Sequence, residues 1–201
     1  MSDESMSRTR RQLIALTSAV GAVGTGFAAV PFVMSWTPSE RARAAGAPVE
    51  VDISKLEAGQ LMTVEWRSKP VWILHRTPEM LAGLEKLSDE MVDPESRVEQ
   101  QPDYVTGIAR SIKPEYLVLE GICTHLGCSP QQPIKAGAVD ALSLGDDWPG
   151  GFFCPCHGSR FDLAGRVYKN VPAPTNLPVP PHKYLSDMRI LIGVDQDSDK
   201  A

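Results

Sequence analysis

Two short stretches, CTHLGC at residues 123–128 and CPCHGS at residues 154–159, contain all four cysteines of the chain and two of its four histidines. We call them the first and second box. Thiolates and imidazoles bind both iron and zinc, and two of each suffice for a 2Fe–2S cluster in which two histidines ligate one iron. In the order Cys-x-His, a gap of 28 residues, then Cys-x-x-His, such a set is Cys123, His125, Cys154 and His157. Cys128 and Cys156 remain, one in each box.

A structural zinc site with two cysteine and two histidine ligands is the competing interpretation of the same four residues. The Cys-x-His spacing of the first box differs from that of a zinc finger. A zinc site also does not need the additional cysteine that each box contains. The pattern therefore favours an iron–sulfur cluster, and metal analysis would separate the two.

The boxes resemble those of Rieske iron–sulfur proteins, in the form carried by the iron–sulfur subunit of ubiquinol–cytochrome c reductase. The likeness extends from Arg10 to Val194. It implies one Rieske-type 2Fe–2S cluster held by the four ligands above, and a disulfide between Cys128 and Cys156. It also implies a mainly β fold. We expect a Rieske-type antiparallel β sandwich with a small cluster-binding subdomain, a short helical insertion and one N-terminal transmembrane helix.

The resemblance also implies a function, that of an oxidoreductase subunit. His157 would meet ubiquinol and take an electron with a linked proton, and His125 would be the second imidazole ligand. The cluster domain would then move and pass the electron to a c-type cytochrome, contributing to respiratory proton translocation. The implied partners are the cytochrome b and cytochrome c1-type subunits of a dimeric complex.

Several neighbours of the ligands have implied roles in the same family. Leu126 would cap the cluster and form part of an apolar docking surface. Gly127 and Gly158 would let the backbone pass close to sulfur, so that amide donors stabilise the reduced state. Ser159 would donate a hydrogen bond to a bridging sulfide.

Two positions depart from the usual family pattern. Phe161 stands where many members have a tyrosine that donates to a thiolate ligand, which predicts a lower reduction potential here. Pro172 belongs to the stretch VPAP at residues 171–174, which resembles the family's proline loop in an altered form. The stretch between the boxes, including residues 146–150, is longer than in the shortest members, and we expect a surface loop there.

Composition sets the broad class of the protein. The chain has 201 residues, of which 42% are hydrophobic and 22% charged, enough for one packed domain and an accessory segment. The formal net charge of −5 argues against a nucleic-acid partner, because phosphate neutralisation needs a basic surface. Seventeen prolines and sixteen glycines indicate many turns and short strands rather than long helices.

The N-terminus predicts export and anchoring. Arg10 and Arg11 stand directly before an apolar run and resemble a twin-arginine signal, so we assign residues 1–12 to a cytoplasmic N-terminus. Residues 13–36 contain no charge over 24 positions, and about 20 helical residues cross a bilayer core of about 30 Å. We expect a transmembrane anchor there.

A cleaved signal peptide is the alternative, with residues 42–44 as a small-residue cleavage site. The length of the apolar run and the resemblance both favour retention. The expected location is the bacterial inner membrane, crossed once, with the cluster domain in the periplasm.

The rest of the chain divides into a linker and a globular domain. Residues 37–48 lack apolar periodicity and predict a flexible hinge, in which Gly46 and Pro48 limit a continuous helix. Residues 49–201 predict the periplasmic cluster domain. Apolar or alternating segments predict its strands at residues 49–53, 61–66, 71–74, 116–119, 151–153 and 188–194.

The remaining segments of the domain are less regular. Pro78 suits the first turn of a helix that we expect to end at Leu87. The polar stretch at residues 88–113 predicts a surface excursion with a little helix, and residues 195–201 a frayed tail. His75 and His182 are interpreted as ordinary surface or hydrogen-bonded residues.

Two other iron–sulfur classes compete with the leading interpretation. A soluble Rieske ferredoxin lacks the membrane segment and usually the two additional cysteines. The small subunit of a periplasmic molybdenum enzyme such as arsenite oxidase shares the export signal and the disulfide. It does not share the combination of Leu126, hinge and proline loop.

Overall fold

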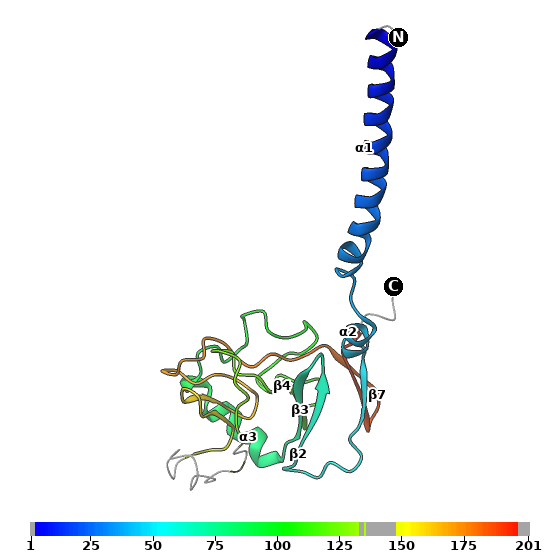
Figure 1. Ribbon diagram of the computed structural model, residues 1–201. Helices are drawn as coiled ribbons and strands as arrows, with labels where there is room; N and C mark the ends of the chain where they lie inside the picture. Colours follow the sequence, from blue (N-terminus) through cyan, green and yellow to red (C-terminus); the bar gives the residue numbers. More distant parts are fainter. Residues whose placement is uncertain (1–2, 133–134, 136–147, 197–201) are drawn as a thin grey trace. The chain divides into compact units, whose positions relative to one another are not determined.

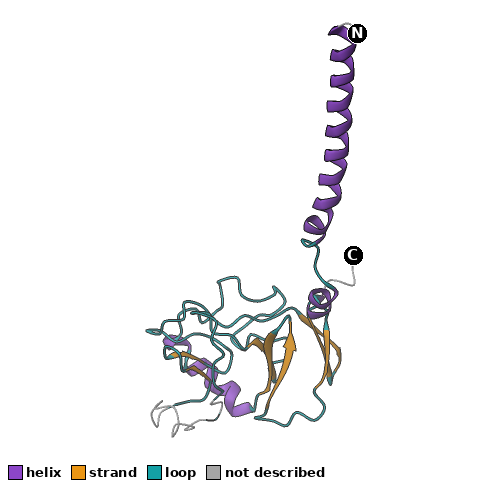
Figure 2. Ribbon diagram, viewed as in Figure 1, coloured by secondary structure: helices purple, strands orange, loops and turns teal. Residues whose placement is uncertain are grey.

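The computed structural model describes residues 3–132, 135 and 148–196 of the chain (Figure 1). It divides the chain into two compact units, Met1–Ala44 and Ala45–Ala201. The first unit is helical, and the second is built mainly of strands and loops with one short helix (Figure 2).

The first unit contains helix α1, Asp3–Met34. It begins ten residues before the apolar run, because no glycine or proline interrupts the polar start of the chain. It ends two residues before the expected limit at residue 36. The part from Ser7 to Met34 is long and apolar enough to cross a membrane. Within it, Thr17 and Thr25 donate their hydroxyls to backbone carbonyls four residues earlier, at 2.8 and 2.9 Å. These two hydroxyls are therefore satisfied within the helix, as an apolar solvent requires.

A second, short helix lies in the segment expected to be a hinge. Helix α2, Glu40–Ala45, begins where the Ser39 hydroxyl accepts a hydrogen bond from the Ala42 amide at 3.2 Å. It ends directly before Gly46, as the positions of Gly46 and Pro48 predict. Six residues are far fewer than the ~12–15 that an isolated helix needs in water, so this helix is marginal on its own.

In its described residues, the second unit contains three antiparallel sheets. One has the order β1-β8-β7, formed by Val49–Asp52, Arg189–Ile192 and His182–Ser186. The next has the order β2-β3-β4, formed by Leu61–Trp66, Lys69–His75 and Tyr116–Glu120. The third is a hairpin of β5 and β6, Phe152–Cys154 and Ser159–Phe161. The predicted mainly β, antiparallel fold is confirmed, although β6 and β7 were not predicted.

Strand β3 separates two hydrophobic cores because successive side chains of a strand point to opposite faces. Val71 and Ile73 join Ile190 and Ile192 of β8 in the core between the two three-stranded sheets. Trp72 and Leu74 face the other way and belong to a second core. That second core also includes both cysteines outside the expected disulfide, so the sandwich directly supports the two boxes.

A short helical insertion follows β3, as predicted. Helix α3, Pro78–Lys86, begins after Thr77, whose hydroxyl accepts from the Met80 amide at 3.3 Å. Its residue Leu84 is buried. A single 3-10 turn, η1, follows at Ser88–Glu90.

The prediction that residues 88–113 form a mere surface excursion is wrong in part. Arg110 and Ser111 are buried, and Asp93 is half-buried, with its carboxylate accepting hydrogen bonds from the amides of Arg97 and Val98. The polar composition hid Arg110 because its burial depends on the carbonyls of Ala164 and Leu177 elsewhere in the chain.

The structure also bears on two histidines outside the boxes, on the stretch at residues 146–150 and on the C-terminal tail. His75 is hydrogen-bonded through Nδ1 to the carbonyl of Leu56 at 2.7 Å, as predicted. His182 is buried, with Nδ1 against the Pro180 carbonyl, but its Nε2 has no partner among the described residues. Of residues 146–150, the first two lie outside the described residues, whereas Trp148 is buried against Met91 and Tyr168 rather than exposed in a surface loop. Residues 197–201 of the expected tail also lie outside the described residues.

Candidate metal centre

The two boxes use the same backbone device. In the first box, the amide of Gly127 donates to the carbonyl of Cys123 at 3.0 Å, and in the second that of Gly158 donates to Cys154 at 2.9 Å. The two glycines have φ of 82° and 79°, the left-handed region that glycine enters without strain. Each box is thus a tight turn that begins at a buried cysteine and closes four residues later.

The left-handed φ of the two glycines gives them a conformational role in these turns. A Cβ at Gly127 or Gly158 would meet no protein atom within 4 Å. Burial raises the pKa of the Cys154 thiol, and hydrogen bonds from the amides of Cys156 and His157 act in the opposite direction. The expected passage of the backbone close to cluster sulfur stays a prediction.

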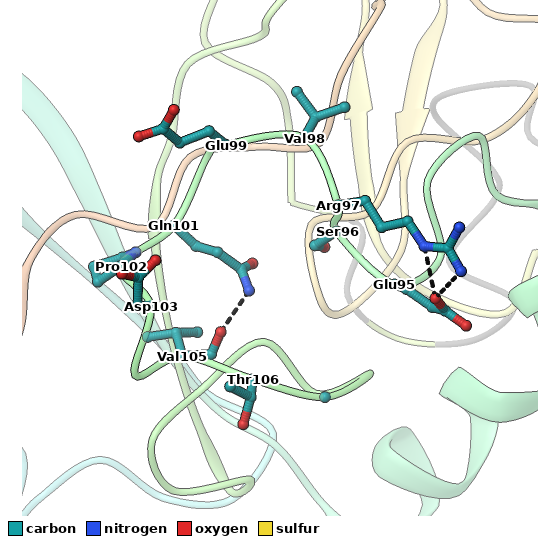
Figure 3. Close-up of a pocket in the computed structure, with 11 residues that line it drawn as sticks. Glu95, Ser96, Arg97, Val98, Glu99, Gln101, Pro102, Asp103, Val105 and Thr106 are labelled. Carbon is teal, nitrogen blue, oxygen red and sulfur yellow. Dashed lines mark hydrogen bonds and ion pairs between the residues drawn. The ribbon is translucent and has the colours of Figure 1, made fainter.

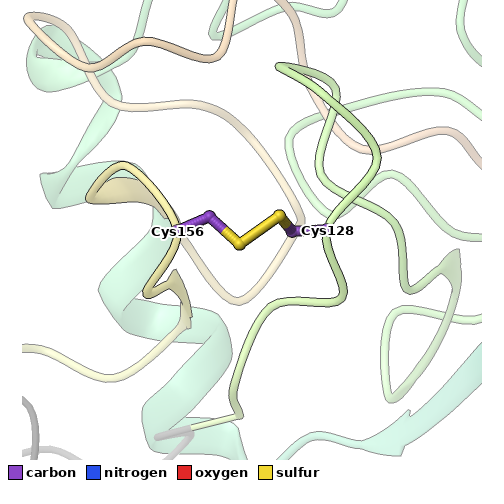
Figure 4. The surroundings of a disulfide bond; sticks show 2 residues. All are labelled: Cys128 and Cys156. Atoms are coloured by element: carbon purple, nitrogen blue, oxygen red, sulfur yellow. A yellow bond between two sulfur atoms is a disulfide. The ribbon is translucent and has the colours of Figure 1, made fainter.

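A disulfide between Cys128 and Cys156 joins the boxes (Figure 4). The two cysteines are 28 positions apart in the sequence. A backbone pair adds to this link, since Gln131 and Phe153 exchange amide-to-carbonyl hydrogen bonds of 2.7 and 2.9 Å. The pairing that the resemblance implied is confirmed.

Cys123 and Cys154 are the free cysteines, and both are buried, with 3% and 2% of their surface exposed. Burial is the main cause that raises the pKa of the Cys154 thiol, and a hydrogen bond with the Cys123 thiol raises it further. Two adjacent thiols in an apolar core are disfavoured as free thiolates, because a buried charge without a partner is costly. A bound metal ion supplies that partner and deprotonates its thiol ligands.

The sulfur atoms of Cys128, Cys154 and Cys156 all lie within 4.8 Å of one another. This group cannot itself be the ligand set, because two of its members are bonded to each other. Its geometry shows instead that the disulfide lies directly beside one free thiol.

The two box histidines contact each other. The rings of His125 and His157 lie edge to face, with centroids 4.7 Å apart. The Nδ1 of His125 is buried and has no hydrogen-bond partner among the described residues. Buried polar atoms nearly always have a partner, so an orphaned imidazole nitrogen in the same box as the free, buried thiol of Cys123 fits a metal ligand. His157 and Leu126 are exposed, the latter by 71%.

The proline loop, residues 171–174, and Thr175 are bonded to both boxes. The amide of Ala173 donates to the Ser159 hydroxyl oxygen at 3.0 Å. The hydroxyl of Thr124 donates to the Thr175 carbonyl at 2.7 Å. Ser159 is fully buried, and its own hydroxyl hydrogen is left to donate elsewhere, as its predicted role requires. Pro172 is exposed at the outer side of the loop.

The remaining expected residue, Phe161, is fully buried in strand β6, where it pairs with Phe152. It belongs to the same core as the free cysteines. No hydroxyl exists at this position, so it contributes packing and no hydrogen bond.

Sequence reasoning missed the buried polar side chains behind the second box. Asp162 accepts hydrogen bonds from the amides of Ala164 and Arg166 and forms a 2.7 Å ion pair with Arg166. Asn176 accepts from the Val167 amide and donates to the carbonyl of Asp93. Only the proximity of these residues to the boxes in the sequence could have indicated that they support the site.

Comparison with known proteins gives two matching family profiles. The family described as "Rieske [2Fe-2S] domain" matches residues 85–181. The family described as "Ubiquitinol-cytochrome C reductase Fe-S subunit TAT signal" matches residues 1–39.

Individual relatives match over nearly the whole chain. The ubiquinol-cytochrome c reductase iron-sulfur subunit of Allochromatium vinosum is 63% identical, over 98% of this chain and 95% of the relative. The protein of the same name from Blastochloris viridis is 42% identical, over 96% of this chain and 97% of the relative. A solved structure described as "Hyperthermophilic respiratory Complex III" is 27% identical, over 88% of this chain and 96% of that one, with a TM-score of 0.46.

Proposed function

Because the chain belongs to the family of ubiquinol–cytochrome c reductase iron–sulfur subunits, we propose that it carries single electrons from ubiquinol to a c-type cytochrome. It is a membrane-anchored subunit of that oxidoreductase complex and contains one Rieske-type 2Fe–2S cluster. The observation that carries the proposal is that two boxes joined by a disulfide each contribute one buried free thiol and one imidazole, and that the two imidazole rings contact each other.

We assign the cluster ligands to the four box residues Cys123, His125, Cys154 and His157. The free, buried thiols support the two cysteines, and the orphaned Nδ1 supports His125. When bound, the cluster supplies a one-electron carrier whose imidazole ligands raise its potential above that of a four-thiolate cluster. The apolar core around the cysteines excludes water from this side of the site.

His157 is the proposed contact with ubiquinol. His157 is exposed in the second box, and the apolar side chain of Leu126 is exposed in the first box, which a disulfide joins to the second. An imidazole that binds iron through one nitrogen keeps the other for hydrogen bonding, so His157 can bond to the quinol hydroxyl and take its proton. Leu126 offers apolar surface for docking at a quinol site.

The proposed topology places residues 1–12 in the cytoplasm, the anchor at residues 13–36 in the bacterial inner membrane and residues 49–201 in the periplasm. The export signal family that matches residues 1–39 supports this orientation. A structural disulfide is also consistent with an oxidising compartment.

Residues 37–48 form the proposed hinge. The exposed, six-residue helix α2 supports this role, because so short a helix can form and melt at little cost. The cytochrome b and cytochrome c1-type subunits of a dimeric complex are the proposed partners, and swinging of the cluster domain between them completes the transfer.

The test compares His157→Ala with the control His75→Ala in purified membranes. His75 is half-buried in the same domain but bonds the Leu56 carbonyl, far from the boxes in the sequence. We expect His157→Ala to lose both the electron paramagnetic resonance signal of the reduced cluster and quinol–cytochrome c reductase activity, and the control to retain both. An unchanged signal in His157→Ala, or zinc in place of iron, would contradict the proposal.

A further inference from the structure

Three arginines are fully buried behind the second box, where one buried aspartate accompanies them. Arg76, Arg110 and Arg166 are exposed by 2%, 0% and 0%, and Asp162 by 0%. A buried charge is costly unless it is paired or fully hydrogen-bonded. Arg166 pairs with Asp162, whereas Arg110 makes its hydrogen bonds to neutral groups.

The guanidinium of Arg110 joins three segments that are distant in the sequence. Its terminal nitrogens donate to the carbonyl of Ala164 at 2.9 Å and to that of Leu177 at 2.8 Å. Its Nε donates to the side-chain oxygen of Gln101 at 2.8 Å. Burial lowers the pKa of Arg110 to about 10 although the Asp162 carboxylate raises it, so the side chain stays charged at neutral pH.

Both carbonyls belong to segments that adjoin the metal centre. Ala164 lies in the turn that directly follows strand β6 of the second box. Leu177 lies three residues after the proline loop, and its own amide donates to the Gly165 carbonyl at 2.8 Å. Arg110 therefore holds the far end of the proline-loop segment against the base of the second box.

The backbone at Arg110 is strained. Its φ is 49°, in the left-handed region that is unfavourable for a residue with a Cβ. Such strain persists where surrounding contacts over-determine the conformation, often at functional sites. Here the contacts are the three hydrogen bonds of the guanidinium, and the strained backbone aims it at the two carbonyls.

We propose that Arg110 is a positioning residue of the metal centre, whose planar guanidinium clamps the proline loop over the second box. The clamp keeps the Ala173 amide on the Ser159 hydroxyl and the Thr175 carbonyl on the Thr124 hydroxyl. Lysine cannot reproduce it, because an ammonium group lacks the rigid fork that addresses separate acceptors at fixed angles. That this clamp shields a cluster rests on the proposed function.

The test uses the full-length protein in its membrane complex, with the variants Arg110→Gln and Arg110→Lys and the control Arg97→Gln. Arg97 lies in the same excursion and loses the same charge, but it is exposed and paired with Glu95 beside an open hollow of about 340 Å³ (Figure 3). The readouts are amide hydrogen exchange in residues 171–177, the rate at which a chelator bleaches the cluster, and the reduction potential.

We expect Arg110→Gln to accelerate exchange and bleaching at least tenfold and to lower the potential, and Arg97→Gln to change none of them. Arg110→Lys keeps the charge and should still accelerate exchange. Wild-type behaviour of Arg110→Gln would overturn the proposal. Wild-type behaviour of Arg110→Lys would overturn it too, because the charge of the side chain and not its clamping geometry would then account for the effect.

If Arg110→Gln does not accumulate, Gln101→Met provides the same test. It removes the acceptor that orients Nε while both carbonyl bonds remain possible. We expect a smaller acceleration of exchange in residues 171–177, and no acceleration would overturn the proposal. Absence of iron from the wild-type protein would contradict the proposed function instead. Failure of the clamp proposal and failure of the proposed function are therefore distinguishable.

Discussion

The rings of His125 and His157 lie edge to face at 88°, with centroids 4.7 Å apart, although they come from different boxes. The same two boxes contain two free thiols with 2–3% of their surface exposed. The boxes therefore combine free thiols in the core with one imidazole, that of His157, at the surface. In the proposed carrier, the exposed imidazole meets the redox partner and the buried thiols are protected from water and oxygen.

The disulfide should contribute substantially to the stability of the cluster domain. In the chain-entropy model, a link between cysteines 28 positions apart contributes roughly 3–4 kcal/mol. We expect the double variant Cys128→Ser/Cys156→Ser to lose about that much free energy of unfolding, measured by urea denaturation. Either single variant should lose a similar amount, and wild-type stability of the double variant would refute the estimate.

Phe161→Tyr should raise the reduction potential of the cluster. A new hydroxyl bond to a thiolate favours the reduced state, and about 1.4 kcal/mol corresponds to about 60 mV for one electron. The matched control is Phe152→Tyr, because Phe152 is equally buried and pairs with Phe161 across the hairpin. Protein-film voltammetry measures both, and equal or absent shifts would count against a specific bond from position 161.

His182 should make the protein less stable in acid. Burial lowers its pKa from 6.5, and its Nε2 has no partner among the described residues. The unfolded chain therefore binds a proton more readily than the folded one, and stability falls as the pH drops below about 6.5, by at most ~1.4 kcal/mol per unit.

In the variant His182→Asn, the amide can replace the bond from Nδ1 to Pro180 but does not titrate. The loss of stability between pH 7 and 5 should be smaller in this variant than in the wild type. Urea midpoints at several pH values measure the difference, and identical slopes would exclude His182 as the cause.

Much of the centre could be predicted because its ligands lie in two short segments. The Cys and His spacings identified the boxes, and the pairing of Cys128 with Cys156 followed from the family resemblance. Alternation of apolar residues likewise located most strands. Strand β6 was missed because its three residues, Ser159–Phe161, are too few to show a period.

The buried arginines could not be predicted in the same way. Arg76, Arg110 and Arg166 resemble surface cations in any hydropathy pattern. Their burial depends on carbonyls that the fold brings from distant segments, such as Leu177 for Arg110. Part of the stretch expected to be a surface loop also packs, because Trp148 is buried against Met91 and Tyr168.

The most direct test of the central claim is pulsed electron paramagnetic resonance of the reduced full-length protein, with ¹⁵N-labelled histidine and analysis of iron and sulfide. We expect two irons and two sulfides per chain, as a 2Fe–2S cluster requires, and hyperfine coupling to two histidine nitrogens. A reduced cluster without histidine coupling, or a chain that binds zinc and no iron, would contradict the account.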